Sequence, residues 1–263
     1  MSNGLNISLK SYDSIFQSEE QRNTEEIKPV PISELKPFTE QPFKVKLDED
    51  MDALVESIKQ CGVLTPVIAR PHKDGGYEIL SGHRRVKACE LAGITDIPVV
   101  VKNLDDDTAT ILLVDSNLQR EHILPSEKAF AYQMKLEAMK RKAGRPSKEN
   151  PRQIVGNLES ADILGQDTGE SGRQIQRYIR LTNLIDPILD MVDNNQIAMN
   201  AAVEISYLSS KEQAAVMQSI EKEETSPSIA QARKMRKFHQ EGNLSNAVID
   251  SIMMEQKPET VKI

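Results

Sequence analysis

The sequence has little of what several protein classes depend on. It contains no tryptophan, 4% aromatic residues and two cysteines among 263 residues. Two cysteines form neither a disulfide framework nor a four-ligand zinc site, so Cys61 and Cys89 are expected to be ordinary buried thiols. Few aromatic rings leave little material for stacking single-stranded bases. A disulfide-stabilised module is excluded, and a single-stranded nucleic-acid binder is disfavoured.

Long apolar runs are also missing. The run at residues 111–114 falls far short of the roughly 18 apolar residues that a membrane-spanning helix needs. The first nine residues are mostly polar and lack a secretory signal pattern. We therefore expect a cytoplasmic protein with no membrane partner.

An excess of positive charge is absent from the chain as a whole. The 33 basic and 40 acidic side chains give a net charge of −7, which argues against general coating of nucleic acid. Residues 122–182 alone are positive, with 11 basic and 7 acidic side chains. Within them, residues 140–152 are strongly basic and contain a Gly-Arg-Pro triplet. This stretch predicts a local anion-binding patch, and the alternative is a solvated, flexible linker.

The length predicts about two domains. Residues 1–26 are polar and acidic and are expected to be a disordered tail. Residues 27–121 mix strand and helix patterns, which indicates an α+β domain. Residues 122–240 have helical periodicity and predict an all-α domain. Residues 241–263 are expected to form a short C-terminal helix or tail, able to pack on the preceding helices or on a partner.

Local patterns predict most elements of the first domain. We expect, in chain order, a helix over 50–61, strands over 66–70 and 77–80 joined by a Gly-Gly turn, a helix over 83–92 and a strand over 97–101. Ser81 is expected to cap the helix over 83–92. Helices over 108–119 and 126–142 follow, with Ser126 expected to cap the second of them.

The start of the expected helix over 83–92 carries unusual charge. His83, Arg84 and Arg85 stand in its first turn, where cations oppose the helix dipole by up to about 1 kcal/mol. Free backbone amides, a glycine at position 82 and two arginine forks would form a phosphate site there. The alternative is that the arginines are solvated on the surface.

A second polar group ends the helix over 108–119. Asp115 and Asn117 supply oxygen atoms beside Arg120, and such oxygens suit a Mg²⁺ ion that also holds a phosphate. The alternative is a plain helix C-terminus, where Arg120 faces the negative end of the dipole.

Residues 160–182 have the layout of a helix-turn-helix. A cap and a helix are followed by a glycine-containing turn, a new cap at Ser171 and a second helix. The expected DNA contacts are Ser171 at the cap and, on the second helix, the side chains suited to base edges and phosphates, which are those of Arg173, Gln174, Arg177 and Arg180. Ahead of this motif, Arg145 in the Gly-Arg-Pro triplet matches the core of an AT-hook, which places arginine in a minor groove. The alternative for the second helix is a solvated polar face.

Taken together, these segments resemble the ParB-type partition proteins, a family of CTP-dependent DNA clamps related in fold to sulfiredoxin. The resemblance rests on an ordered set of segments, followed by the helix-turn-helix: ISELKP at 32–37, CGVLTPVIAR at 61–70, GHRRVKA at 82–88 and NLQR at 117–120. It implies an α+β ParB/sulfiredoxin-like N-terminal domain followed by an all-α helix-turn-helix domain, in a short form of the family.

The resemblance also assigns ligands. It implies that CTP and Mg²⁺ are bound, with nucleotide contacts from Gly62, Thr65, Pro66, Arg70, Ser81, Gly82, His83, Arg84, Arg85, Asn117 and Arg120. Asn117 would help to hold Mg²⁺. The family usually has Glu at the position of His83 and also at the position of Ser116. The second Glu belongs to the metal and hydrolysis site, so the sequence leaves open whether CTP is hydrolysed.

The resemblance further implies partners. These are double-stranded DNA, a ParA-type ATPase and a second copy of the chain bound through the N-terminal domains, at the nucleoid or on a plasmid. One alternative is a helix-turn-helix transcriptional regulator with a vestigial nucleotide pocket. Another is a nucleotide-dependent small-molecule kinase, which would leave the helix-turn-helix unexplained. Sulfiredoxin chemistry is excluded, because Gly82 stands where a nucleophilic cysteine is required.

Overall fold

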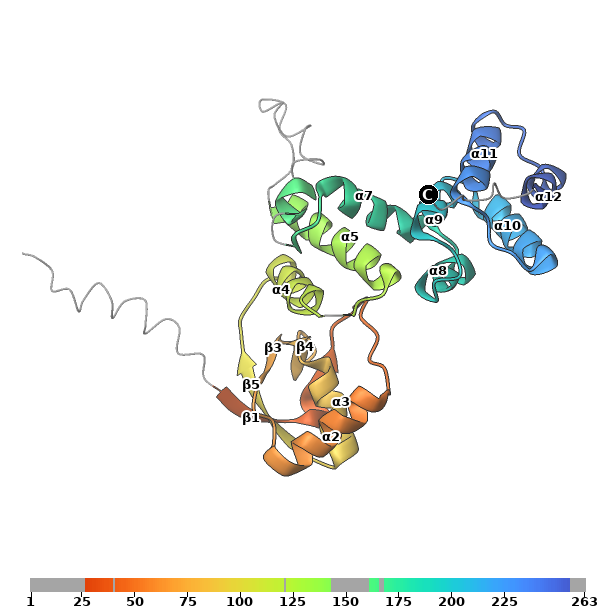
Figure 1. The fold of residues 1–263 in the computed structure, drawn as a ribbon. Helices are drawn as coiled ribbons and strands as arrows, with labels where there is room; N and C mark the ends of the chain where they lie inside the picture. The colour runs from red at the N-terminus through yellow and green to blue at the C-terminus, as the bar shows by residue number, and fades with distance from the viewer. Residues whose placement is uncertain (1–26, 40, 121, 143–160, 166–167, 256–263) are drawn as a thin grey trace, which may run out of the picture. The chain divides into compact units, whose positions relative to one another are not determined.

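The computed structural model describes residues 27–39, 41–120, 122–142, 161–165 and 168–255 (Figure 1). The chain divides into two compact units. Unit 1 consists of Met1–Phe38 and Val45–Leu104, and unit 2 consists of Thr39–Lys44 and Asp105–Ile263. The expected tail at 1–26 and Arg145 lie outside the described residues. Among the residues that are described, no helix is both long enough and apolar enough to cross a bilayer.

Unit 1 is built on a five-stranded sheet with strand order β1-β5-β3-β4-β2. The pairs β2 with β4 and β3 with β5 are parallel, and the pairs β1 with β5 and β3 with β4 are antiparallel. The elements are β1 Ile27–Pro31, the 3-10 helix η1 Ile32–Glu34, β2 Leu35–Pro37, α2 Glu49–Cys61, β3 Val67–Pro71, β4 Tyr77–Ser81, α3 His83–Ala92 and β5 Asp96–Val101. The mixed α+β architecture predicted for the N-terminal part is confirmed.

The helices α2 and α3 of unit 1 lie side by side and pack on the sheet through their apolar faces (Figure 1). The buried set includes Met51, Val55 and Ile58 of α2 and Val86 and Cys89 of α3. Cys89 is buried as expected, and this burial raises the pKa of its thiol. The same expectation was wrong for Cys61, which is exposed because it is the last residue of α2.

The helices α2 and α3 begin in different ways. Asp48 caps α2, and its carboxylate accepts a hydrogen bond from the backbone N–H of Met51. The residue that precedes α3 is Gly82, with φ at +107°, and this N-cap glycine has no side chain to accept from the first turn of α3. The predicted Ser81 cap is therefore wrong, because Ser81 is the last residue of strand β4. The N-terminus of α3 therefore lacks an N-cap side chain.

The regular elements described in unit 2 are all helices, as predicted for the C-terminal part. Residues 161–165 are helical. The other elements are α4 Asp106–Leu118, α5 Pro125–Lys142, α7 Gly172–Arg180, the 3-10 helix η3 Leu181–Asn183, α8 Asp186–Asp193, α9 Met199–Ile205, α10 Ser210–Glu223, α11 Ile229–Gln240 and α12 Asn246–Met254. In α12, Ile249, Ile252 and Met253 are buried in the largest core of this unit. The expected C-terminal helix therefore packs on the helices before it.

The start of α5 also differs from the sequence-based expectation. Pro125 is the first residue of α5, so Ser126 lies inside the helix and does not cap it. The backbone N–H and hydroxyl of Ser126 instead donate to the carboxylate of Asp193, at the end of α8. Glu127 accepts from the backbone N–H groups of Leu124, at 3.2 Å, and Lys44, at 2.9 Å. This buried carboxylate attaches the segment Thr39–Lys44 to α5.

Candidate functional site

The open N-terminus of α3 lies against the loop that precedes β3. The guanidinium of Arg85 donates to the carbonyl of Thr65 and, at 2.7 Å, to the carbonyl of Pro66. A Cβ atom added to Gly82 would lie 3.0 Å from Cγ2 of Val67 and 3.2 Å from Nη2 of Arg85. Two segments that the sequence assigns to one nucleotide, 62–70 and 81–85, are thus brought together inside unit 1.

The three basic residues at the start of α3 have different environments. Arg84 forms an ion pair with Asp48 at 3.3 Å and remains partly exposed. His83 is buried. Burial lowers the pKa of the Arg85 guanidinium, which remains cationic at neutral pH. An open helix N-terminus beside two arginines is an arrangement that can hold a phosphate.

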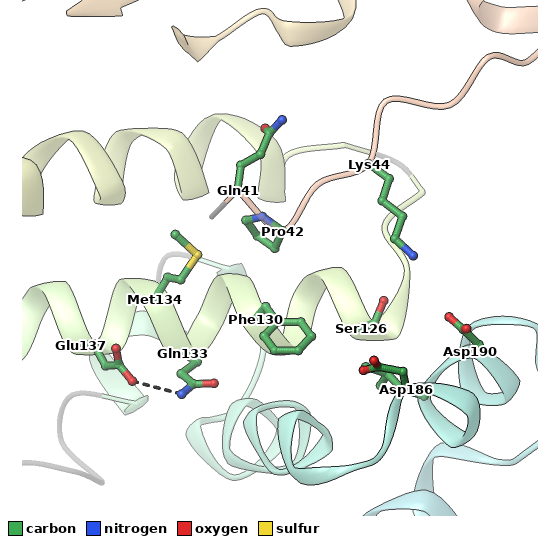
Figure 2. A pocket seen from close by; sticks show the side chains of 11 residues that line it. Gln41, Pro42, Lys44, Ser126, Phe130, Gln133, Met134, Glu137, Asp186 and Asp190 are labelled. Atoms are coloured by element: carbon green, nitrogen blue, oxygen red, sulfur yellow. Dashed lines mark hydrogen bonds between the residues drawn. The ribbon is translucent and has the colours of Figure 1, made fainter. Parts of the chain in front are cut away.

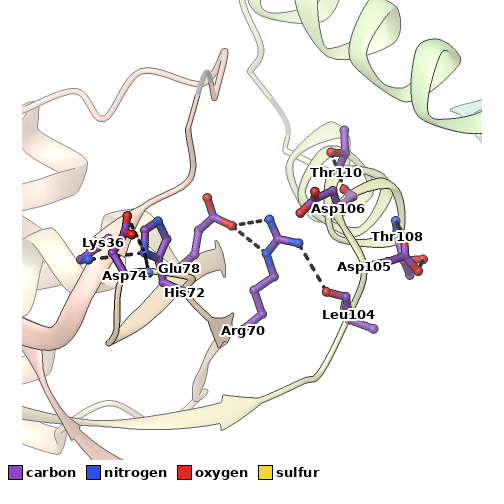
Figure 3. Close-up of polar contacts among 10 residues, drawn as sticks. All are labelled: Lys36, Arg70, His72, Asp74, Glu78, Leu104, Asp105, Asp106, Thr108 and Thr110. Carbon is purple, nitrogen blue, oxygen red and sulfur yellow. Dashed lines mark hydrogen bonds and ion pairs between the residues drawn. The ribbon is translucent and has the colours of Figure 1, made fainter. Parts of the chain in front are cut away.

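Arg70 lies in a buried polar network on β3 and β4 (Figure 3). Its Nε and Nη2 atoms lie 2.7 and 2.6 Å from Oε2 of Glu78, and Nη1 donates to the carbonyl of Leu104 at 3.3 Å. The guanidinium also lies 5.7 Å from the centroid of the Phe38 ring. Its charge is therefore balanced by Glu78 within unit 1. Contact between Arg70 and a nucleotide stays a prediction.

The predicted magnesium ligand belongs to unit 2. Asn117 is buried in α4, and its Nδ2 atom donates to the carbonyl of Leu113 at 2.8 Å, so the oxygen is the side-chain atom left for a cation. Ser116 donates its hydroxyl to the same carbonyl, at 3.0 Å. The nearby carboxylate of Asp115 forms an ion pair of 2.5 Å with the buried ammonium of Lys135. Among the described residues, no group of three His, Cys, Asp or Glu side chains is arranged to hold a metal ion.

The helix-turn-helix of unit 2 is closely packed. Ile175 of α7 is fully buried with Tyr132, Ala161 and Leu164. A Cβ atom added to Gly172 would lie 2.1 Å from Oδ1 of Asp162. Glycine therefore allows α7 to approach the helix over 161–165, and the pair forms the predicted layout.

The polar side chains of α7 are not equivalent. Arg173 is exposed, whereas Gln174 and Arg177 are partly exposed and their side chains lie 3.4 Å apart. Arg180 points elsewhere: its Nη2 donates to the carbonyl of Ser206 at 2.9 Å, and its guanidinium lies 4.0 Å from the centroid of the Tyr207 ring. The three arginines predicted to face DNA therefore differ in environment. Arg173 is exposed at the N-terminal end of α7, whereas Arg180 at the C-terminal end is held by residues that follow α9. Sequence reasoning missed Tyr207, because no local signal links it to α7.

Ser171 is the N-cap of α7, as the sequence predicts. Its hydroxyl accepts from the backbone N–H of Gln174 at 3.2 Å. The Ser171→Ala change should lower the free energy of unfolding by about 1 kcal/mol, because one first-turn amide loses its acceptor. Chemical denaturation of wild type and variant measures this difference. Ser245→Ala, which removes the equivalent cap of α12, is the matched control for a cap outside the helix-turn-helix.

An open pocket of about 690 Å³ lies within unit 2, between the segment at 41–44, α5 and α8 (Figure 2). Phe130 and Met134 supply apolar surface, and Asp186 and Asp190 line it one helical turn apart. No motif in the sequence points to this pocket, since its walls come from three separate segments.

Comparison with known proteins identifies the two parts of the chain. The family model of the ParB N-terminal domain matches residues 16–118, and that of the ParB HTH domain matches residues 158–246. The chain is 30% identical over 194 residues to a nucleoid occlusion protein from Geobacillus sp. (strain WCH70), covering 73% of this chain and 62% of the relative. It is 41% identical over 108 residues to the chromosome-partitioning protein Spo0J from Thermus thermophilus, covering 41% of this chain and 40% of the relative.

The solved structure of a pNOB8-like ParB N-domain shares the fold. It matches with a TM-score of 0.51 at 14% identity and covers 87% of this chain and 95% of that chain. The alignments with the two relatives span less than two thirds of those proteins' own length. With a ParB N-terminal domain followed by a ParB helix-turn-helix domain, this chain belongs to the ParB-like proteins.

Proposed function

We propose that this protein binds a specific double-stranded DNA site through α7 and acts in the segregation of a chromosome, plasmid or mobile element. One observation carries the DNA-binding part: α7 is capped by Ser171, anchored by Ile175 and leaves Arg173 exposed, with Gln174 and Arg177 partly exposed beside it. A helix held in this way can enter a major groove, where arginine and glutamine side chains bond to guanine and adenine. The match to the ParB HTH domain supports the same role.

We propose that the N-terminus of α3 holds the phosphates of CTP. The fit rests on three features of unit 1: a helix N-terminus whose N-cap residue is glycine and forms no side-chain cap, a position where a Cβ atom would crowd Val67 and Arg85, and two arginines. A bound nucleotide would supply the negative charge that this helix end lacks. Gly62, Thr65 and Pro66 would line the base and ribose.

The remaining ligands and partners are proposed from the family. Asn117 would hold Mg²⁺ through its side-chain oxygen, since its nitrogen is engaged within α4. Ser116 offers a hydroxyl where the family has a carboxylate, so the proposed activity is binding of CTP. A ParA-type ATPase and a second copy of the chain are the proposed protein partners, and nucleoid or plasmid DNA is the proposed location.

Two measurements on the full chain test this function. Selection from a random duplex library should enrich a single DNA motif, and calorimetry with CTP in the presence of Mg²⁺ should show saturable binding. Failure to enrich any motif would reject sequence-specific DNA recognition, and absence of CTP binding would reject the nucleotide site. Mapping of bound sites across the host genome then separates the two roles: one sharp peak with flanking spread indicates partition, and scattered promoter peaks indicate transcriptional regulation.

A further inference from the structure

A stack of side chains joins the C-terminal end of α7 to α9 and α11. Tyr207 follows α9, and its ring contacts two guanidinium groups. Cζ of Arg180, from α7, lies 4.0 Å from the ring centroid, and Cζ of Arg236, from α11, lies 3.5 Å from it. Arg180 also donates to the carbonyl of Ser206 at 2.9 Å. One aromatic ring therefore connects the DNA-reading helix to two helices outside the helix-turn-helix.

The two arginines of the stack differ in how their charge is balanced. Arg236 donates to Glu204 at 2.8 Å, and the same carboxylate pairs with Arg233 at 3.3 Å. Arg180 forms no ion pair within the described residues; it is held by a carbonyl and by the face of Tyr207. The negative face of an aromatic ring attracts a cation more strongly when the cation is partly desolvated. The Nε atom of Arg180 is buried and has no hydrogen-bond partner within the described residues. The contacts that hold this side chain are therefore the carbonyl of Ser206 and the ring of Tyr207.

We propose that Tyr207 is a positioning residue for DNA recognition, a role that rests on the proposed binding of DNA by α7. By holding Arg180 at one end of α7, the ring fixes the rotation of that helix about its own axis. This rotation sets the direction in which Arg173 and Gln174 point at the other end. Hydrogen bonds to base edges tolerate only small displacements, whereas attraction to phosphates is less directional. Loss of the ring should therefore reduce binding to the specific site more than binding to unrelated DNA.

The test compares two changes at the same position in the full chain. Tyr207→Leu removes the ring but keeps an apolar side chain, and Tyr207→Phe keeps the ring. Fluorescence anisotropy gives the dissociation constants for the duplex selected above and for a scrambled duplex at several salt concentrations. We expect Tyr207→Leu to weaken binding of the selected duplex about tenfold and to leave the scrambled duplex unchanged. The slope of log K against log salt should also stay unchanged, because no phosphate contact is lost. Tyr207→Phe should bind as the wild type does.

Two further variants guard against a trivial loss of structure. Arg236→Gln removes the second guanidinium from the ring and should reproduce part of the loss of affinity for the selected duplex. This variant therefore tests the stack even if Tyr207→Leu lowers the melting temperature. Arg233→Gln removes an arginine that pairs with the same Glu204 from the same helix, and it should leave binding unchanged. Equal affinity of wild type and Tyr207→Leu for the selected duplex would overturn the proposal, as would an equal loss on both duplexes. A wild-type protein that shows no preference between the duplexes would instead reject the proposed function.

Discussion

Replacing Arg173 and Arg177 together by alanine should lower the affinity for the selected duplex about a thousandfold, with no change in melting temperature. Each arginine that bonds bidentately to a guanine contributes about 1 to 3 kcal/mol of discrimination, and two such losses add to roughly 4 kcal/mol. Neither side chain supports the fold: Arg173 is exposed, and Arg177 donates to Gln174, a neighbour on the same helix. A gel-shift titration against the selected and scrambled duplexes measures the loss.

A matched control separates base reading from general attraction. Arg233→Ala combined with Lys237→Ala removes two exposed cations from α11 without touching α7. This double variant has the same net charge as the double variant of α7, so it should share any small, salt-dependent loss of affinity for all DNA. It should keep the preference for the selected duplex. Wild-type preference in the Arg173 and Arg177 variant would reject this face of α7 as the reading surface.

The helix-turn-helix could be predicted from sequence because its signals are local. Ser171 caps the helix that follows it, Ile175 is the apolar residue that faces the core, and Gly172 permits close packing on the preceding helix. The contacts of Arg180 could not be predicted in the same way. Its spacing matches a polar stripe on α7, but its partner Tyr207 comes from beyond the end of α9, and helical periodicity contains no information about that contact.

Cap positions show a second limit of local patterns. Serine is a favourable N-cap in general, yet neither Ser81 nor Ser126 caps its helix. Ser81 pairs with Ile68 in the antiparallel ladder between β3 and β4. Ser126 donates to the carboxylate of Asp193, which belongs to a distant helix. In both cases a tertiary contact overrides the local preference. Because Gly82 and not Ser81 precedes α3, no N-cap side chain competes with the anion that we propose binds at this end of the helix.

The proposed phosphate site follows from charge. His83, Arg84 and Arg85 oppose the dipole of α3, which is unfavourable unless an anion is present. What the sequence could not show is that Arg85 turns toward the carbonyls of Thr65 and Pro66. This contact connects two motifs that are separated by a strand hairpin, and it makes the residue before α3 the tightest point of the site.

The Gly82→Ala change should therefore reduce CTP affinity at least a hundredfold. Gly82 has φ at +107°, and a Cβ atom there would lie 3.0 Å from Cγ2 of the fully buried Val67 and 3.3 Å from Cζ of Arg85. The backbone strain and the crowding should together lower the free energy of unfolding by about 1 to 3 kcal/mol. The same Cβ atom would stand beside the amides proposed to bind phosphate. Calorimetry with CTP and Mg²⁺ measures the affinity, and thermal unfolding shows whether the variant is folded.

The opposite end of the same helix supplies the control. Gly93 ends α3 with φ at +74°, and a Cβ atom there would meet no atom within 4 Å. Gly93→Ala should therefore have a similar cost of left-handed backbone, about 1 kcal/mol, but no crowding and no contact with the proposed site. If Gly93→Ala binds CTP as the wild type does and Gly82→Ala does not, the loss arises at the N-terminus of α3. If both variants bind CTP equally well, the phosphates lie elsewhere, and the open end of α3 is only a structural feature of the ParB N-terminal domain.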